Sequence, residues 1–589
     1  SIYRGLWKKY KNYYEQRLNF ENSSSKNPRS LSISTNLDRM QSRIQSISIN
    51  KDSNIYKCCL VKLTHHIKGI INMENTKIKF TFCQDDENTL NGITVNDENL
   101  NAILQDSDED HMFDKDMGAC FGSTFKNKKN DKDKVYINIS YEKIQYLFIR
   151  NYFYQETGLE IFTTSHKNYY FNFKNSSQLH EALYEIIRNG DYREIKADDY
   201  KGKKTLGYEK VGKDIKSKSY YVSNKMSEWR KYKISTLEYL MWMNIYGGRS
   251  YNDLTQYPVF PWLILDYSSD EISSDNYRNL FLPMGMIDIN DKSITRKETF
   301  IDKYESLLSV LKETFPNFNY SEYLKKGDEY YDNYKNKKSK NFFGRTFSLN
   351  SKNQKANEME TTDTNANSIE LNQLPSFYGS HYSNPTYVSH FLTRIFPFSL
   401  IAIEIQGDKF DDPNRMFLSI SRAFESASTL NDDIRELIPE FYTLPDIFQN
   451  KNNLNLAQGK TDANNDKIEI NDVELPPWSN DAPNTFITEK RKILEKSDLK
   501  INKWIDIIFG SYQRGEKAAK IFNIFQAQTY ERMVKIDTIK DDDMRNALLR
   551  LVEVGVTPMQ ILDTDSKPKI DKKEFLLKNS VYSLSKGNR

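Results

Sequence analysis

The sixteen residues Gly247–Trp262, GGRSYNDLTQYPVFPW, strongly constrain the fold of this chain. Their glycines and prolines interrupt any regular helix or strand, because proline lacks an amide proton and glycine loses much backbone freedom on ordering. The same stretch holds two tyrosines, a phenylalanine and a tryptophan, which bury large apolar areas. It therefore predicts buried but irregular backbone, whose amide and carbonyl groups must each find a partner.

The length and composition predict several folded domains with polar insertions. The chain has 589 residues, whereas single hydrophobic cores stop growing near about 250–300 residues. Apolar residues make up only 38%, yet aromatic residues reach 13%, which disordered chains do not show. The 84 Lys and Arg against 81 Asp and Glu leave a net charge of +3, too balanced to indicate a nucleic-acid-binding protein.

The cysteines indicate a reducing, cytosolic compartment. There are four, Cys58, Cys59, Cys83 and Cys120, and no CxxC motif. This excludes a disulfide framework and a cysteine zinc site. The longest apolar runs fall short of the roughly 20 residues that span a bilayer. No secretory signal is visible, but the chain begins at Ser1 without Met, so this observation excludes little.

Composition divides the chain into five parts. They are a basic N-terminal helix and mobile segment (1–50), a first domain (51–192) with an acidic insertion (84–116), a linker (193–225), a second domain (226–563) with polar insertions (336–372 and 449–468), and a polar tail (564–589).

The first domain has the pattern of strands followed by one helix. Residues 54–83 alternate between apolar and polar, which predicts two or three antiparallel strands with turns at Lys68-Gly69 and Glu74-Asn75. Residues 135–174 supply three or four more strands. A helix follows, with Ser176 or Ser177 as its N-cap and Gly190 past its end. About seven strands and a C-terminal helix are typical of a pleckstrin-homology (PH) type barrel.

Helices dominate the second domain. One begins near Ser235, where Ser235 and Glu238 can form a capping box, and ends at Gly247-Gly248. Further helices are expected over 300–335 and over 488–525, the latter broken at Gly510. The fold class is therefore a multidomain α+β protein, with a PH-like barrel before a mostly helical domain.

Enzyme motifs are missing from the sequence. HExxH, GxSxG and GxGxxG do not occur. The histidines His381 and His390 with Asp411 are the strongest remaining catalytic candidates, and a hydrolase or transferase using them stays an alternative. Their nine-residue spacing matches no metal-ligand pattern, so no enzyme, metal or cofactor is expected.

Lipid binding by the first domain is a second alternative. Lys62 and Lys68, with His65 and His66, lie where PH barrels grip phosphoinositides, and the N-terminal helix is also basic. Because the next loop is strongly acidic, a barrel that faces protein is favoured.

Several ordered blocks resemble the BEACH domain family (Beige and Chediak–Higashi, neurobeachin-like). They are ISTLEYLMWMNIYGGRSYNDLTQYPVFPWLILDY (234–267), RNLFLPMG (278–285), the block Phe377–Ile420, DIRELIPEFYTLPDIFQN (433–450), INKWIDIIFGSYQRGEKA (501–518) and VTPMQIL (556–562). Residues 146–173 are similar to the PH-like module that precedes the domain in this family. Phe377 replaces the family's leading His, and Ser511-Tyr512 replaces Tyr-Lys. The WD repeats that usually follow are not seen, so either the chain is truncated or they are missing.

The resemblance implies a non-enzymatic scaffold of membrane trafficking, peripheral on endomembranes or vesicles. It also implies a core of extended, irregular backbone covered by helices. A protein partner of the trafficking machinery is expected in a groove between the two domains. The candidate groove residues are Tyr152, Phe153, Tyr154, Trp242, Tyr246 and Arg249, because aromatic and Arg side chains are enriched at interfaces.

The other motif residues are expected to support the fold. Asn252 and Asp253 can make Asx turns, and Pro258 removes a donor that would need a partner. Glu436 and Glu440 are expected to pair with Arg249, Arg394 or Arg415. The remaining members of this structural set are Trp262, Asp411, Arg415 and Trp504.

Overall fold

The computed structural model describes residues 55–82 without 64–65, 136–190, 215–287, 376–530 with short gaps, and 551–570. The short gaps are 377, 408, 431–432, 459, 462–467, 515–516, 519–520 and 527–528. The predictions for residues 1–50, 84–116, 300–335 and 336–372, and for His65 and Phe377, lie outside the described residues.

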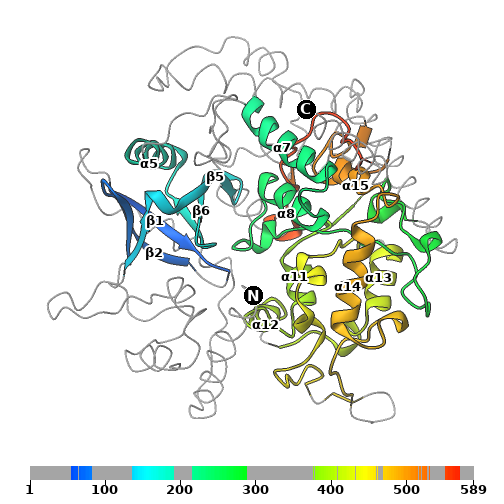
Figure 1. Ribbon diagram of the computed structural model, residues 1–589. Helices are drawn as coiled ribbons and strands as arrows, with labels where there is room; N and C mark the ends of the chain where they lie inside the picture. The colour runs from blue at the N-terminus through cyan, green and yellow to red at the C-terminus, as the bar shows by residue number, and fades with distance from the viewer. Residues whose placement is uncertain are drawn as a thin grey trace, which may run out of the picture.

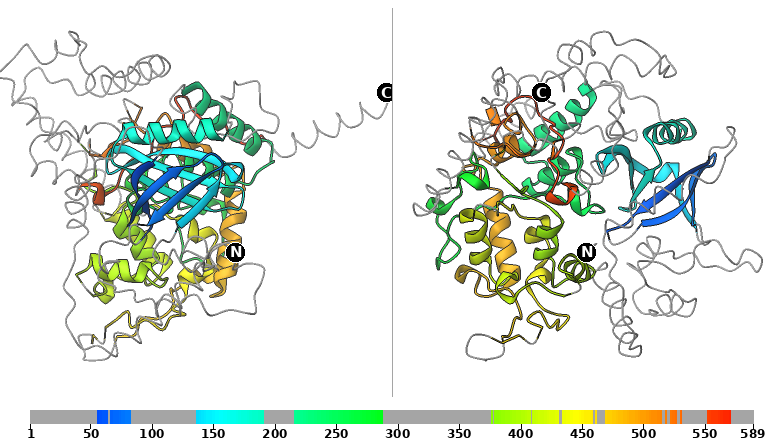
Figure 2. Two further views of the ribbon diagram at one scale, coloured as in Figure 1. Left: turned by 90° about the vertical axis from the view of Figure 1, so that its left-hand side faces the viewer. Right: turned by 180° about the vertical axis from the view of Figure 1, so that it is seen from behind.

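Seven strands form one antiparallel sheet that curls around its own core (Figures 1 and 2). They are β1 (Ile55–Val61), β2 (His66–Met73), β3 (Lys77–Phe82), β4 (Tyr136–Ser140), β5 (Ile144–Tyr152), β6 (Gln155–Thr163) and β7 (Asn168–Phe173). Their order is β4-β3-β2-β1-β7-β6-β5. Helix α5 (Ser176–Asn189) follows and buries Leu179, Leu183 and Ile186 against the sheet. The expected PH-like barrel with a C-terminal helix is confirmed.

One of the two turns expected in the first domain is wrong. Lys68 and Gly69 lie inside β2, and Gly69 pairs with Cys58 of β1. A Cβ atom on Gly69 would approach the Phe80 ring to 2.5 Å and the Thr81 carbonyl oxygen to 2.4 Å, so close strand packing and not a turn requires the glycine. The turn at Glu74-Asn75 is confirmed between β2 and β3.

Side-chain caps mark the helix starts. Asn175 caps α5 by accepting from the amide of Gln178 at 2.9 Å, so the expectation of a serine cap is wrong. Ser235 caps α8 (Thr236–Tyr246) as expected, accepting from the amide of Glu238 at 3.1 Å. Gly247 follows the last residue of α8. Helix α7 (Ile215–Arg230) begins inside the range assigned to the linker.

The second domain is helical around irregular backbone, as expected. Its other α-helices in the described residues are α11 (Pro385–Phe391), α12 (Phe398–Ile405), α13 (Ile420–Thr429), α14 (Pro483–Leu494) and α15 (Ile501–Ile508). The described segments between them combine extended backbone with short 3-10 turns, and isolated bridges such as Phe260 with Leu437 and Ile264 with Tyr277 pair some of them. Figure 1 shows these helices gathered into one body. Its large aromatic core includes the fully buried Trp229, Trp262 and Trp504.

Two ranges given to polar segments contain anchored residues. Leu454, Leu456 and Ala457, in the range of the second insertion, are buried in a small separate core together with Phe396, Phe410, Met416 and Ile470. In the C-terminal tail, the Ser566 amide donates to Asp506 of α15 at 2.7 Å. Among the helices that the structure describes, none has the length and apolarity to cross a bilayer.

Candidate functional site at the junction of the two domains

Strand β5 carries apolar side chains on both faces. Leu147 and Ile149 belong to the core of the sheet, whereas Tyr146 and Phe148 pack with the core of the second domain. Because successive side chains of a strand point to opposite faces, this is the pattern of a strand covered on both sides. The run of apolar residues in YLFIR indicates burial on both faces of the strand, whereas its alternation alone predicts only a strand.

Aromatic rings of β5 meet those of α8 across the junction. The ring centroids of Tyr146 and Trp242 are 5.1 Å apart at an interplanar angle of 70°. Those of Phe148 and Tyr246 are 5.9 Å apart at 74°. The Lys225 ammonium, from α7, lies 4.9 Å from the Trp242 centroid. Edge-to-face geometry of this kind adds about 0.5–1.5 kcal/mol per pair beyond apolar burial.

A buried ion pair lies beside these rings. The Arg150 Nε and Nη2 atoms are 2.7 and 2.6 Å from the Glu160 Oε2 atom, and both side chains are almost fully buried. Arg150 Nη1 also donates to the Ile245 carbonyl at 2.6 Å, at the C-terminal end of α8, where the helix dipole favours a cation. Glu160 in turn accepts from the Ser250 hydroxyl at 2.6 Å. The pair therefore joins the two domains.

The loop after α8 completes the junction. The Asn252 side-chain nitrogen donates to the side-chain oxygen of Asn168 on β7 at 2.6 Å. The Gln256 side-chain nitrogen donates to the backbone carbonyl of Asn151 on β5 at 2.7 Å. Asp253 makes the expected Asx turn, because its carboxylate accepts from the amide of Thr255 at 2.9 Å. The segment GGRSYNDLTQYPVFPW thus connects the domains to each other as well as filling the second domain.

The β5–β6 hairpin lies at the same junction. Its two central residues, Phe153 and Tyr154, have φ values of 46° and 64°, which bulky side chains rarely adopt. Tyr152 is buried, and its hydroxyl lies 2.6 Å from the His66 Nε2 atom. Phe153 packs on Tyr152 with ring centroids 4.7 Å apart. The Tyr154 hydroxyl is buried without a hydrogen-bond partner among the described residues, and burial raises its pKa.

The six candidate groove residues lie in three places. Tyr152, Phe153 and Tyr154 share the hairpin, and Trp242 and Tyr246 pack on β5. Arg249 instead lies in the interior of the second domain, 1% exposed. Its Nη1 donates to the Tyr257 carbonyl at 3.3 Å and its Nη2 to the Val556 carbonyl at 2.6 Å, and burial lowers its pKa. Sequence reasoning missed Arg150, Glu160, Asn168, Ser250 and Gln256.

Replacing Arg249 with Ala is expected to lower the melting temperature. Two buried carbonyls, those of Tyr257 and Val556, would lose their donor, and each orphaned acceptor costs about 1–3 kcal/mol. Removal of a buried cation offsets part of this loss. Thermal unfolding followed by circular dichroism measures the change. An unchanged melting temperature combined with lost partner binding would contradict a structural role for Arg249.

The hydrolase candidates lie in three different environments. His381 is fully buried, its ring lies tilted against that of Tyr382, and its Nε2 atom is 3.1 Å from the Thr557 hydroxyl. Burial holds the His381 pKa well below its usual range. His390 instead packs beside the Phe417 ring. Asp411 pairs with Arg415 in a surface turn. In the described part of the chain, the three side chains form no hydrogen bond or ion pair with one another, and no group of potential metal ligands occurs there.

Glu436 is the centre of the second domain's polar network. Its carboxylate accepts from both terminal nitrogens of Arg278 at 2.8 and 2.9 Å, from the Trp262 amide at 3.1 Å and from the Trp504 indole at 3.0 Å. The expected pairing of Glu436 with Arg249, Arg394 or Arg415 is therefore wrong. Arg394 donates to two backbone carbonyls.

The remaining motif residues lie in the same interior. Glu440 accepts from the Tyr257 hydroxyl at 2.8 Å, and Pro258 is buried.

The two lipid-binding candidates lie in the first domain. Lys62 follows β1, and Lys68 is an exposed residue of β2.

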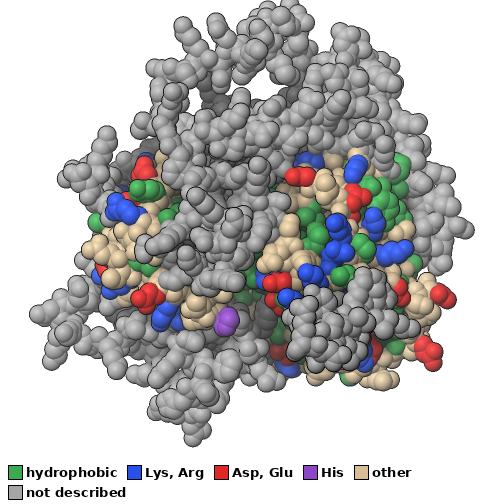
Figure 3. Space-filling model, turned by 45° about the horizontal axis from the view of Figure 1, so that its top comes forward, with side chains coloured by type: hydrophobic (Ala, Val, Ile, Leu, Met, Phe, Trp, Pro, Cys, Tyr) green, Lys and Arg blue, Asp and Glu red, His purple; other side chains and the backbone are tan. Residues whose placement is uncertain are grey.

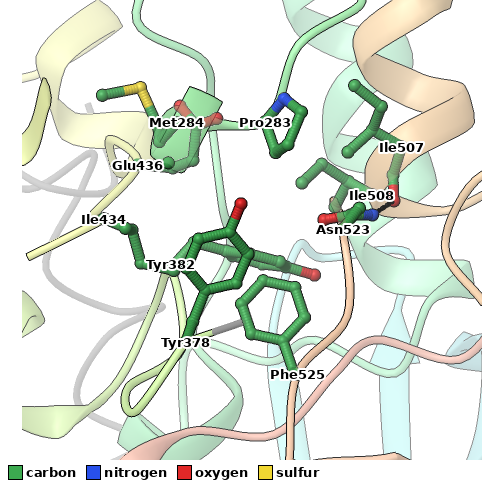
Figure 4. Close-up of a pocket in the computed structure, with 11 residues that line it drawn as sticks. Pro283, Met284, Tyr378, Tyr382, Ile434, Glu436, Ile507, Ile508, Asn523 and Phe525 are labelled. Carbon is green, nitrogen blue, oxygen red and sulfur yellow. Dashed lines mark hydrogen bonds between the residues drawn. The ribbon is translucent and has the colours of Figure 1, made fainter. Parts of the chain in front are cut away.

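One small cavity lies within this network (Figure 4). Its volume is about 10 Å³, and its walls include Tyr378, Tyr382, Asn523 and Phe525. The Asn523 side-chain oxygen is buried there without a partner in the described residues, whereas the Tyr382 hydroxyl interacts with the Arg249 side chain. Because a water molecule needs about 10–15 Å³ and polar partners, the cavity suits one water and not a substrate.

Comparisons with known proteins agree with this architecture. The family model of the Beige/BEACH domain matches residues 227–328 and 328–569, and that of the PH domain associated with Beige/BEACH matches residues 58–187.

Curated relatives match the same region. Beige protein homolog 1 of Saccharomyces cerevisiae is 34% identical over 350 residues, 58% of this chain and 13% of that protein. A putative neurobeachin homolog of Caenorhabditis elegans is 29% identical over 435 residues, 72% of this chain and 14% of that protein. BEACH domain-containing protein B of Arabidopsis thaliana is 32% identical over 340 residues, 56% of this chain and 10% of that protein. The chain thus spans 10–14% of the length of these relatives. With both domain models matched in the order that the fold shows, the chain belongs to the Beige/BEACH family.

Proposed function

We propose that this chain is a non-enzymatic scaffold of membrane trafficking that binds a protein partner beside the junction of its PH-like and BEACH domains. The observation that supports this most strongly is the buried Arg150–Glu160 pair, with its bonds to Ile245 and Ser250. Separating the domains would leave the pair intact within the sheet but would break its hydrogen bonds to the Ile245 carbonyl and the Ser250 hydroxyl. Hydrogen bonds to charged groups contribute about 1.5–3 kcal/mol each. The two domains would therefore present one rigid surface, as a scaffold requires.

The β5–β6 hairpin is our candidate contact point on that surface. Two-residue hairpin turns with positive φ at both positions favour Asn-Gly, yet this chain has Phe153-Tyr154. Such strain costs about 1–3 kcal/mol per residue and concentrates at functional sites. Part of the Phe153 side chain is exposed, and aromatic anchors dominate binding energy at protein interfaces. The aromatic turn therefore supports a role in partner binding better than a role in folding.

The variant Phe153→Asn/Tyr154→Gly tests this proposal, because it installs the turn sequence that the backbone prefers. We expect its free energy of unfolding to stay within about 1 kcal/mol of the parent, since relief of strain offsets lost packing. Loss of one aromatic anchor of about 2 kcal/mol weakens binding about 30-fold. Partners are identified by affinity capture and mass spectrometry, and their Kd is then measured with purified protein by calorimetry.

Tyr184→Ala is the matched control, because Tyr184 is a 62% exposed aromatic residue on α5, outside the hairpin. It should leave the Kd unchanged. If the hairpin variant binds the same partners with the parent's affinity, the junction is not the binding surface.

A further inference from the structure

Half-buried aromatic rings and lysines share one surface of the BEACH domain, formed around the start of α15. We call it the lysine–aromatic surface; its members are Tyr277, Phe281, Tyr512, Lys496, Lys500, Lys503 and Lys517. In Figure 3, Lys and Arg side chains gather around hydrophobic ones on the BEACH half of the visible face.

Each ring on this surface has a lysine over it. The Nζ atoms of Lys496 and Lys503 lie 5.0 and 5.3 Å from the ring centroids of Tyr277 and Phe281. Lys517 Nζ lies 5.1 Å from the centroid of Tyr512, whose ring is 5.0 Å from that of Phe281. These contacts place side chains from three chain segments, around residues 280, 500 and 515, next to one another.

The surface carries more lysines than ion-paired carboxylates. Lys517 pairs with Asp565 at 2.9 Å. In the part of the chain that the structure describes, no carboxylate forms an ion pair with Lys496, Lys500 or Lys503. The Lys496 ammonium donates to the neutral Tyr277 hydroxyl, and Lys503 interacts with the Asp506 and Asp565 carboxylates only at longer range. A positive charge on each of these three lysines can therefore still attract an anionic partner.

The interior of the domain holds these rings in place. Arg278, between the two rings of its segment, points inward to Glu436, and its Nη2 donates to the Leu282 carbonyl at 3.1 Å. Its backbone amide donates to the Leu263 carbonyl at 2.9 Å. Tyr277 and Phe281 therefore flank an anchored residue and stay at the surface.

We propose that the lysine–aromatic surface binds the anionic headgroup plane of a phospholipid bilayer. Aromatic rings and lysines are the side chains that suit a membrane interface, where the ring has an apolar body and the ammonium meets lipid phosphate and carboxylate. None of the seven residues lines the cavity of Figure 4. Charge spread over an outer surface matches the diffuse charge of a bilayer better than it matches one peptide. This site is separate from the partner-binding hairpin and from Lys62 and Lys68.

Vesicle binding tests the proposal. The 589-residue chain is mixed with phosphatidylcholine vesicles that contain about 30% phosphatidylserine, a composition like that of anionic membranes, or with phosphatidylcholine alone, and bound protein is sedimented. We expect binding only to the anionic vesicles, with a steep decrease as salt screens the charges. One lysine near an anionic surface contributes about 1 kcal/mol to binding. Removing two charges in Lys496→Gln/Lys503→Gln should therefore lower the vesicle partition coefficient about 30-fold.

Lys174→Gln/Lys409→Gln is the matched control, because it removes two charges from exposed residues elsewhere. It should change binding less than about 3-fold, and circular dichroism checks that each variant is folded. The proposal is overturned if Lys496→Gln/Lys503→Gln binds anionic vesicles as well as the parent does. It is also overturned if the parent chain does not bind anionic vesicles. Loss of binding only in Lys62→Gln/Lys68→Gln assigns the site to the barrel and also overturns it. The proposal is overturned as well if the parent chain binds a polyglutamate peptide but does not bind anionic vesicles, because the surface would then recognise an acidic peptide. Partner capture by the hairpin is measured without lipid, so the two proposals can fail separately.

Discussion

Replacing Glu436 with Leu is expected to lower the free energy of unfolding by about 3–5 kcal/mol, because Arg278 would be left as a buried, unpaired cation. The Trp262 amide and the Trp504 indole would lose their acceptor in the same variant. Urea unfolding followed by tryptophan fluorescence measures the change.

The double variant Arg278→Met/Glu436→Leu is the control for this prediction. With both charges gone, most of the lost stability should return, since buried pairs replaced by apolar side chains are often neutral. Glu436→Gln, which keeps one acceptor oxygen, should fall between the two. A loss below about 1 kcal/mol in the single variant would show that water reaches this site.

Replacing Lys490 with Met is expected to stabilise the protein by about 1–4 kcal/mol. Lys490 is 0% exposed, and its ammonium nitrogen has no hydrogen-bond partner in the described residues. Four rings surround it at centroid distances of 4.4–5.9 Å, those of Tyr442, Phe441, Phe486 and Trp262. Burial holds the Lys490 pKa well below its usual range. Methionine has a similar length and avoids the cost of burying an amine.

The stability gained by Lys490→Met is expected to depend on pH, and the direction follows from the lowered pKa of Lys490. The unfolded chain binds the Lys490 proton more tightly than the folded chain, because burial lowers the pKa only in the folded state. Stability therefore falls as the pH decreases from about 10.4 toward the folded-state pKa, by up to about 1.4 kcal/mol per unit. The advantage of the Met variant should be large at pH 7.5 and shrink toward pH 10. Urea unfolding at both pH values measures it; a less stable Met variant would mean that the rings stabilise a charged lysine.

Local features of the fold were predictable because neighbours in the sequence produce them. The α8 cap depends on Ser235 and Glu238, three residues apart. Strand alternation likewise predicts the sheet and its following helix. The glycine at position 69 was misread because its packing partners, Phe80 and Thr81, lie on another strand. A glycine in a turn and a glycine under a ring look the same in a sequence.

The candidate site was predicted only in part, because it is formed by residues that are far apart in the sequence. Aromatic enrichment indicated Trp242 and Tyr246, whose rings pack on Tyr146 and Phe148 of β5. It did not indicate Arg150 or Glu160, because a strand arginine is usually exposed until a second domain covers it.

By itself, the sequence determined the family, the order of the two domains and the irregular backbone after α8, since ordered motifs, Gly, Pro and Asn act locally. Only the tertiary structure decided which polar groups meet. Arg278 binds Glu436 across 158 residues, and Ser250 binds Glu160 across 90. Such pairings depend on which surfaces pack together. A buried charge accepts whichever partner that packing brings within hydrogen-bond distance, and composition and spacing do not specify it.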